Sequence, residues 1–123
     1  MIRHITAGAA PAVGGPYSHA TIAGGLTFLS GQRPVHPETG AIPEGVDAQA
    51  RQVLHNLQAV LAECGGDLRD VAKVTVYLDD IADFDRVNAV YREFFADPYP
   101  ARTTVAASLR GILVEIDAIA EID

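Results

Sequence analysis

The sequence predicts an α+β fold, in which a mixed β-sheet carries two helices packed on one of its faces. Two segments, residues 46–64 and 84–95, have apolar side chains at the three- and four-residue spacing of an amphipathic helix. Short stretches rich in β-branched and apolar residues surround them, separated by Gly, Pro and Asp, as is typical of strands. Strands around two helices favour a sheet with both helices on the same face.

Length and charge limit the classes of protein to consider. The 123 residues suffice for one hydrophobic core but not for two, so we expect a single domain over residues 1–123. A hydrophobic content of 49% excludes a disordered chain. The net charge of −7, with scattered Lys and Arg, argues against nucleic-acid binding. The first residues do not resemble a signal peptide and no segment approaches the roughly 18 apolar residues of a membrane span, so we expect a soluble cytoplasmic protein.

Cysteine and histidine offer no catalytic or metal-binding pattern. Cys64 is the only cysteine, which excludes an intrachain disulfide, and we interpret it as a small buried residue at a helix end. His19, His36 and His55 have no second His, Cys or paired carboxylate at metal-ligand spacing. We expect these histidines on the surface and predict no metal site.

The N-terminal half begins with strand signals. Residues 17–23 and 26–30 indicate two strands joined by Gly24-Gly25, a dipeptide suited to the positive φ values of a tight hairpin. Residues 3–6 are consistent with a short first strand. Gly31 then follows the hairpin, where a missing Cβ lets the backbone approach a ligand closely. A plain strand exit explains the same residue equally well.

The central part of the chain alternates helix and strand. The helix at residues 46–64 has Asp47 in its first turn and Gly65 in position to cap its C-terminus. Residues 71–78 alternate as a strand that is half exposed or faces a partner. The second helix, residues 84–95, carries an aromatic stripe that we interpret as core packing, with Asn88 as its polar exception.

The end of the chain indicates a β-hairpin. Residues 103–107 and 113–122 are apolar and β-branched, and the four residues 108–111 between them have turn chemistry. This loop length would place four polar side chains on one surface, because residues two apart on a strand share a face. They are Arg102, Thr104, Glu115 and Asp117.

A guanidinium beside carboxylates has two interpretations. An ordinary cross-strand ion pair between Arg102 and Asp117 is the one that these residues alone favour. The other is half of a site that binds an anion through Arg102 and handles a proton through Glu115.

Short motifs occur along the whole chain. They are Gly-Pro-Tyr-Ser at residues 15–18, Leu-Ser-Gly-Gln at 29–32, Asn-Leu at 56–57, Cys-Gly-Gly at 64–66, the strand segment 70–78, Asn-Ala-Val-Tyr-Arg-Glu-Phe-Phe at 88–95, Pro-Ala-Arg at 100–102 and Val-Glu-Ile at 114–116. In this order they resemble the reactive intermediate deaminase family, the RidA/YjgF group of enamine and imine deaminases. Members of the founding type carry Ser-Cys where this chain has Thr103-Thr104, so a role that needs a thiol is excluded here.

The resemblance implies a chorismate-mutase-like fold that assembles as a homotrimer, with a central barrel and active clefts between subunits. It also implies cofactor-independent hydrolysis of 2-imino acids and enamines, such as 2-iminopropanoate and 2-aminoacrylate, to 2-keto acids and ammonia. Arg102 would bind the substrate carboxylate, and Glu115 would position the attacking water and shuttle its proton. The expected substrate-binding residues are Tyr17, Ser30, Gly31 and Asn88, with the backbone of Thr104 completing the water site.

A protein without enzymatic activity is the alternative hypothesis. The same cleft around Arg102 would then bind a keto acid or similar metabolite as a sensor or regulator. Loss of the Glu115 carboxylate separates the two cases, because turnover needs it and carboxylate binding does not. A ribonuclease, as some relatives are labelled, conflicts with the acidic charge of the chain.

Overall fold

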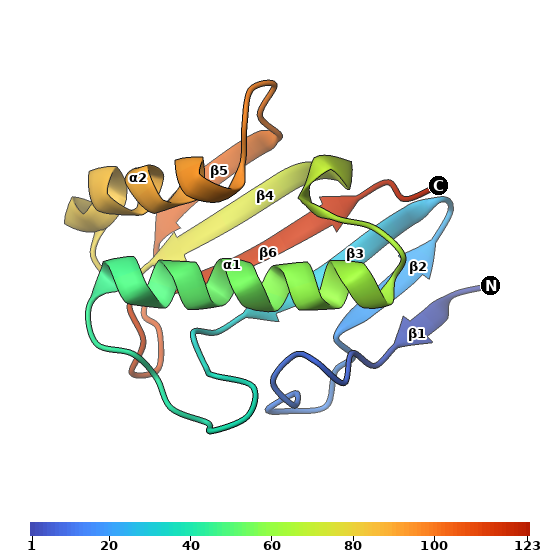
Figure 1. Ribbon diagram of the computed structural model, residues 1–123, viewed down its shortest axis with the longest axis horizontal. Helices are drawn as coiled ribbons and strands as arrows, with labels where there is room; N and C mark the ends of the chain where they lie inside the picture. The colour runs from blue at the N-terminus through green and yellow to red at the C-terminus, as the bar shows by residue number, and fades with distance from the viewer.

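Six strands form one sheet in the computed structural model, which describes residues 1–123. In sheet order the strands are β1 (Arg3–Ile5), β2 (Ala20–Ala23), β3 (Leu26–Gln32), β6 (Val114–Ala120), β4 (Val71–Leu78) and β5 (Ala101–Ala106). Only β4 and β5 pair in parallel. The helices α1 (Val46–Glu63) and α2 (Phe84–Phe94) cross the same face of the sheet (Figure 1). The predicted α+β fold with both helices on one face is therefore confirmed.

The first hairpin is also as predicted. Gly24 and Gly25 have φ values of 58° and 80° and connect β2 to β3 as a two-residue turn, with Ala23 opposite Leu26. Strand β2 begins at Ala20, later than the predicted residue 17, and β3 extends to Gln32.

The second predicted hairpin, between residues 103–107 and 113–122, is wrong, because β4 lies between β5 and β6. A parallel pair needs a long crossover, and α2 provides one between β4 and β5. The segment read as a tight turn instead passes the end of β4, where the N–H of Ala107 donates to the carbonyl of Leu78 at 2.9 Å. Local turn residues could not reveal that a distant strand enters this gap.

The observed register separates the side chains that were predicted to share a surface. Arg102 and Thr104 lie on the helix-covered face, since Arg102 is opposite Val74, which is fully buried. Glu115 and Asp117 alternate with the buried residues of β6 and lie on the helix-free face. The predicted common surface therefore does not exist within one chain.

Helix α1 covers the middle of the sheet with a continuous apolar side. Its fully buried large residues include Val53, Leu54, Leu57, Val60 and Leu61. Burial of each leucine side chain contributes about 2 kcal/mol. Gly65, with φ 85°, ends the helix as predicted, and the N–H of Gly66 donates to the carbonyl of Leu61 at 2.9 Å. Neither helix is long and apolar enough to cross a membrane.

Helix α2 packs beside α1, but its aromatic stripe is only partly in the core. Val87, Val90 and Tyr91 are buried, as is Phe95 just beyond the helix end. The prediction that Phe84 packs in the core is wrong, because its side chain is 41% exposed at the first turn of α2.

His19 was expected on the surface, and the structure corrects this as well. Its exposed fraction is 5%. Nδ1 accepts the N–H of Ala7 at 3.1 Å, and Nε2 therefore carries the proton that it donates to the carbonyl of Pro11 at 2.7 Å. The ring ties the N-terminal loop to the start of β2.

Two buried carboxamides of α1 hold the loops that follow β3 and precede β6. Asn56 Nδ2 donates to the carbonyls of Arg33 and Val35, both at 2.9 Å. Gln49 Oε1 accepts the N–H of Leu113 at 2.8 Å. The exposed fractions of Asn56 and Gln49 are 2% and 5%, so these bonds are shielded from water. The loops after β3 and before β6 are thereby fixed to the same helix.

Asn56→Ala is expected to lower the free energy of unfolding by about 2 kcal/mol, because the carbonyls of Arg33 and Val35 lose their shared donor. Gln58→Ala, on the exposed side of α1, is the control and should change stability by less than about 0.5 kcal/mol. Denaturant unfolding at one fixed protein concentration measures both. Equal losses in the two variants would contradict the anchoring role.

Candidate functional site

Arg102 is positioned by α2 at the edge of the sheet. Its Nη2 donates to Asn88 Oδ1, and its Cζ lies 4.8 Å from the ring centroid of Tyr91 and 5.4 Å from that of Phe84. Each cation–π contact contributes about 1 kcal/mol and holds the plane of the guanidinium. The predicted ion pair with Asp117 is wrong, since the two residues lie on opposite faces.

The guanidinium of Arg102 has no carboxylate partner at all. The ion pairs of the chain join Arg51 to Glu93, Arg69 to Asp67 and Arg86 to Asp47. Arg102 therefore keeps most of its N–H donors available for an anion from outside the chain.

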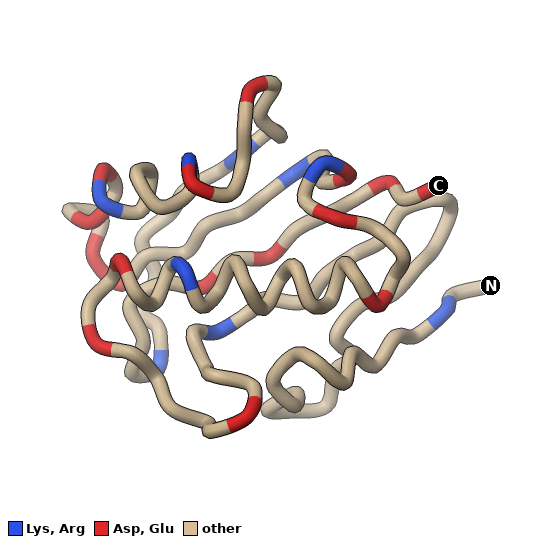
Figure 2. Tube along the Cα trace, viewed as in Figure 1, with Lys and Arg blue, Asp and Glu red and all other residues tan.

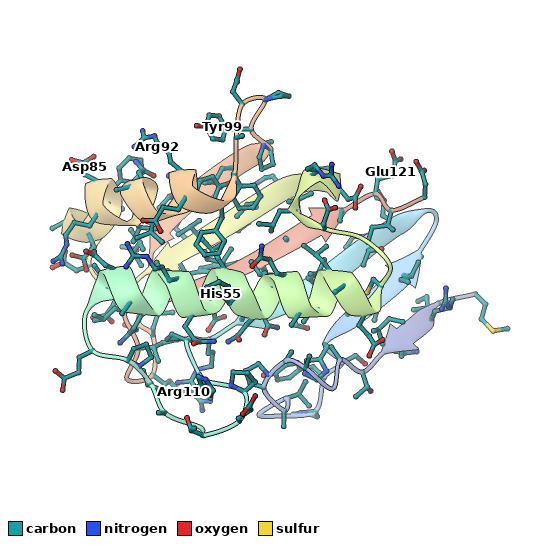
Figure 3. All side chains as sticks on the ribbon, in the orientation of Figure 1. His55, Asp85, Arg92, Tyr99, Arg110 and Glu121 are labelled. Carbon is teal, nitrogen blue, oxygen red and sulfur yellow. The ribbon has the colours of Figure 1, made fainter.

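An open cleft of about 260 Å³ surrounds this guanidinium. Its lining residues are Asn88, Tyr91, Arg92, Tyr99, Pro100 and Arg102. Figure 3 shows Arg92 and Tyr99 on the outer side of α2 and the loop that follows it. The hydroxyl of Tyr91 is buried without a hydrogen-bond partner, and burial raises the pKa of this tyrosine. The sequence pattern indicated only a packing role for Tyr91, but its hydroxyl is an unsatisfied donor beside Arg102.

Glu115 lies on the opposite face, in a second cleft of about 460 Å³. The lining residues there are Tyr17, Ser30, Gly31, Arg33, Ser108, Leu109, Arg110 and Glu115. Burial raises the pKa of the Glu115 carboxyl, and the nearby Asp117 adds to the rise, while Arg33 and Arg110 oppose it. The sequence motifs did not indicate Arg33 or Arg110, which come from loops that only the tertiary fold brings to Glu115.

A β-bulge shapes this second cleft. Leu29 pairs with Ala118 and Gln32 with Ile116, so β3 has one more residue than β6 over the same stretch. Ser30 and Gly31 occupy the bulge.

The backbone of Gly31 lies close to the Glu115 side chain. A Cβ on Gly31 would overlap Glu115 Oε2 and would lie 3.1 Å from its Cδ. The group beside Gly31 is a side chain of the same chain, so the predicted approach of a ligand to this glycine stays a prediction. Ser30 Oγ donates to the carbonyl of Ser18 at 2.7 Å, and Tyr17 Oη accepts the N–H of Gly14 at 3.2 Å.

The predicted site residues thus divide into two groups. Arg102 and Asn88 line the cleft beside α2, and four residues line the cleft on the helix-free face: Tyr17, Ser30, Gly31 and Glu115. Thr104 lies on the face of Arg102, opposite Val76, and lines neither cleft. No group of three or more His, Cys, Asp or Glu side chains is arranged to hold a metal ion.

Residues 7–122 match the family described as Endoribonuclease L-PSP. A RutC family protein of Pyrococcus horikoshii is 48% identical over 114 residues, which are 90% of each chain. The 2-iminobutanoate/2-iminopropanoate deaminase of Salmonella typhimurium is 41% identical over 125 residues, which are 98% of each chain. A protein of Lactococcus lactis named as a regulator, AldR, is 41% identical over 116 residues, 92% of each chain.

Solved structures agree with these sequence relationships. RidA from the Antarctic bacterium Psychrobacter is similar with a TM-score of 0.93 and 39% identity, covering 98% of this chain and 99% of that one. TdcF of E. coli, solved with bound serine, has a TM-score of 0.91 and 38% identity over the same shares. The resemblance inferred from the motifs is confirmed: the chain belongs to the Endoribonuclease L-PSP family, which is the YjgF/RidA family.

Proposed function

We propose that the protein hydrolyses 2-imino acids and their enamine tautomers to 2-keto acids and ammonia. The observation that carries the proposal is the guanidinium of Arg102, which is fixed in an open cleft without any carboxylate partner. In the reaction, water adds to the C=N carbon and the C–N bond then breaks, so that imine and water give keto acid and ammonia. Relatives about 40% identical that are named as 2-iminobutanoate/2-iminopropanoate deaminases support this chemistry.

Arg102 binds the 2-carboxylate in this proposal. One N–H of the guanidinium donates to Asn88 Oδ1, and the rings of Tyr91 and Phe84 restrict rotation of the guanidinium. A planar carboxylate can then accept two parallel hydrogen bonds. Orientation of the substrate is a large part of the task, because imines already react with water and need only a fixed geometry and one proton transfer.

Glu115 handles the proton. Its carboxyl takes a proton from the attacking water and passes it to the departing amine. Burial raises the pKa of this carboxyl in the direction of neutral pH. A group that must both accept and donate a proton works best when its pKa is near the working pH. The carboxyl lies beside the bulge, where the missing Cβ of Gly31 leaves room for it.

The reaction needs two copies of the chain, because Arg102 and Glu115 lie on opposite faces of one sheet. In the proposed homotrimer, one subunit contributes the Arg102 cleft and its neighbour the Glu115 cleft, around a central barrel. The helix-free face offers an apolar surface for such contacts, since Leu26, Phe28 and Val105 are 36–39% exposed there.

A metabolite-binding regulator is the second candidate. The relative named as a regulator and the TdcF structure with bound serine favour it. Arg102 is needed in both cases, whereas Glu115 is needed only for turnover. The family description also mentions endoribonuclease, but the chain has a net charge of −7 and its basic residues are dispersed among acidic ones (Figure 2).

Arg102→Lys is expected to reduce kcat/KM by about 30-fold, or about 2 kcal/mol of transition-state stabilisation, because lysine cannot offer two parallel donors to one carboxylate. Thermal stability should change little. Arg51→Lys, at an exposed ion pair, is the matched control. Unchanged deaminase activity in the Arg102→Lys protein would move the carboxylate site elsewhere.

Glu115→Gln is expected to lower kcat by about 100-fold or more while keto acid binding persists. Wild-type Glu115 has a pKa raised above its unfolded value, so the folded state binds more protons and wild-type stability falls as pH rises through the window above about 4.5. The glutamine variant lacks this loss and should gain stability relative to wild type over that window. Turnover, keto acid titration and melting temperature against pH measure the three effects.

Glu121→Gln, at an exposed position just beyond β6, is the control for these measurements. Full turnover in Glu115→Gln would exclude Glu115 as the proton-transfer group, whereas keto acid binding without turnover in the wild-type protein would favour the regulator. A stability difference that does not vary with pH would contradict the buried carboxyl.

Mixing two inactive variants tests the shared site. Arg102→Ala and Glu115→Gln chains, unfolded together and reassembled, are expected to recover about a quarter of wild-type activity, because random assembly pairs two intact clefts at about one site in four. Each variant alone should stay inactive, and sedimentation should give a trimer. No recovery from a mixed trimer would show that both residues act within one chain.

A further inference from the structure

Arg33 and Arg110 lie together in the Glu115 cleft, and the reaction described above uses neither. Both line that cleft, and Arg33 Nη2 donates to the main-chain carbonyl of Arg110 at 3.0 Å. Figure 2 shows the two basic segments side by side below α1, one after β3 and the other in the loop before β6. Neither guanidinium is within ion-pair distance of a carboxylate, Glu115 included.

The backbone on both sides of this arginine pair is hydrogen-bonded to α1. Asn56 holds the carbonyl of Arg33, and Gln49 holds Leu113 at the other end of the loop that carries Arg110. Asn56 is itself oriented by Gln52, whose Nε2 donates to Asn56 Oδ1 at 3.0 Å. A site whose supports are buried and hydrogen-bonded is organised before a ligand arrives.

Two cations in one cleft repel each other unless an anion lies between them. The chain has 16 Asp and Glu but only nine Lys and Arg, and three of its arginines are already neutralised by acidic neighbours. Glu115 interacts with both arginines at longer range but forms an ion pair with neither, and it must carry a proton during the reaction, so it does not neutralise the pair. The cleft therefore has room and charge for a second anionic group.

We propose that Arg33 and Arg110 form a second carboxylate subsite, which selects 2-imino acids with an acidic side chain. This inference rests on the proposed deaminase function. Arg102 of one subunit would bind the 2-carboxylate, and the arginine pair of the next would bind the side-chain carboxylate, with the C=N carbon near Glu115. For the imine of aspartate, water replaces the imino nitrogen and the products are a keto diacid and ammonia.

The test compares two imines, supplied by oxidation of aspartate and of alanine. The wild-type protein should have a kcat/KM at least 10-fold higher for the dicarboxylic imine. Arg33→Gln and Arg110→Gln should each lower this ratio by 10-fold or more, and the ratio cancels any effect on Glu115 that both substrates share. Arg86→Gln, at an exposed ion pair, is the control and should keep the wild-type ratio.

Binding of succinate and propionate, followed by NMR titration, gives a readout that does not depend on turnover. Succinate should bind at least 10-fold more tightly than propionate, and Arg33→Gln should remove the difference. Hydrolysis of the alanine imine without a preference for the aspartate imine would overturn the subsite and leave the deaminase proposal intact.

Arg33-dependent succinate binding without hydrolysis of either imine would support the subsite and overturn the deaminase proposal. A change of assembly in Arg33→Gln with an unchanged substrate ratio would assign the arginine pair to a subunit contact and overturn the subsite.

Discussion

The parallel pairing of β5 with β4 is the constraint on which the arrangement of this molecule depends. It places Arg102 opposite Val74, under the helices, where Asn88 and Tyr91 hold the guanidinium. The same insertion of β4 leaves Glu115 on the other face of β6. A site that used both residues would therefore have to lie between two copies of the chain.

Helix α1 has a second role besides covering the core. Its buried carboxamides, Gln49 and Asn56, are bonded to loops that are distant in sequence from each other. These bonds are strong because water is excluded, and losing a partner would leave buried polar groups unsatisfied. The position of the loops around Glu115 is consequently determined by the packing of α1 on the sheet, although neither carboxamide touches the cleft.

Periodic patterns predicted the two helices, the Gly24-Gly25 hairpin and the strand at residues 71–78, because these features depend on neighbouring residues. The pairing of the last two strands was not predictable in this way, since turn residues carry no information about a third strand that enters between them. His19 was misplaced for the same reason, because its partners Ala7 and Pro11 are brought to it by tertiary folding.

The motif residues were recognised one by one, but their division between two faces followed only from the strand order. Both clefts contain groups that the stability of the fold does not explain. Near Arg102 they are an unpaired guanidinium, an unsatisfied Tyr91 hydroxyl and the exposed ring of Phe84. Near Glu115 they are a desolvated carboxyl, a bulge and two arginines that have no ion-pair partner. The buried hydroxyl and the desolvated carboxyl each cost stability in the isolated chain, and a ligand carboxylate or a neighbouring subunit would offer partners to several of these groups. Polar and charged groups that lack partners within the chain are typical of surfaces that bind a ligand or another subunit, because folding alone would not favour them there.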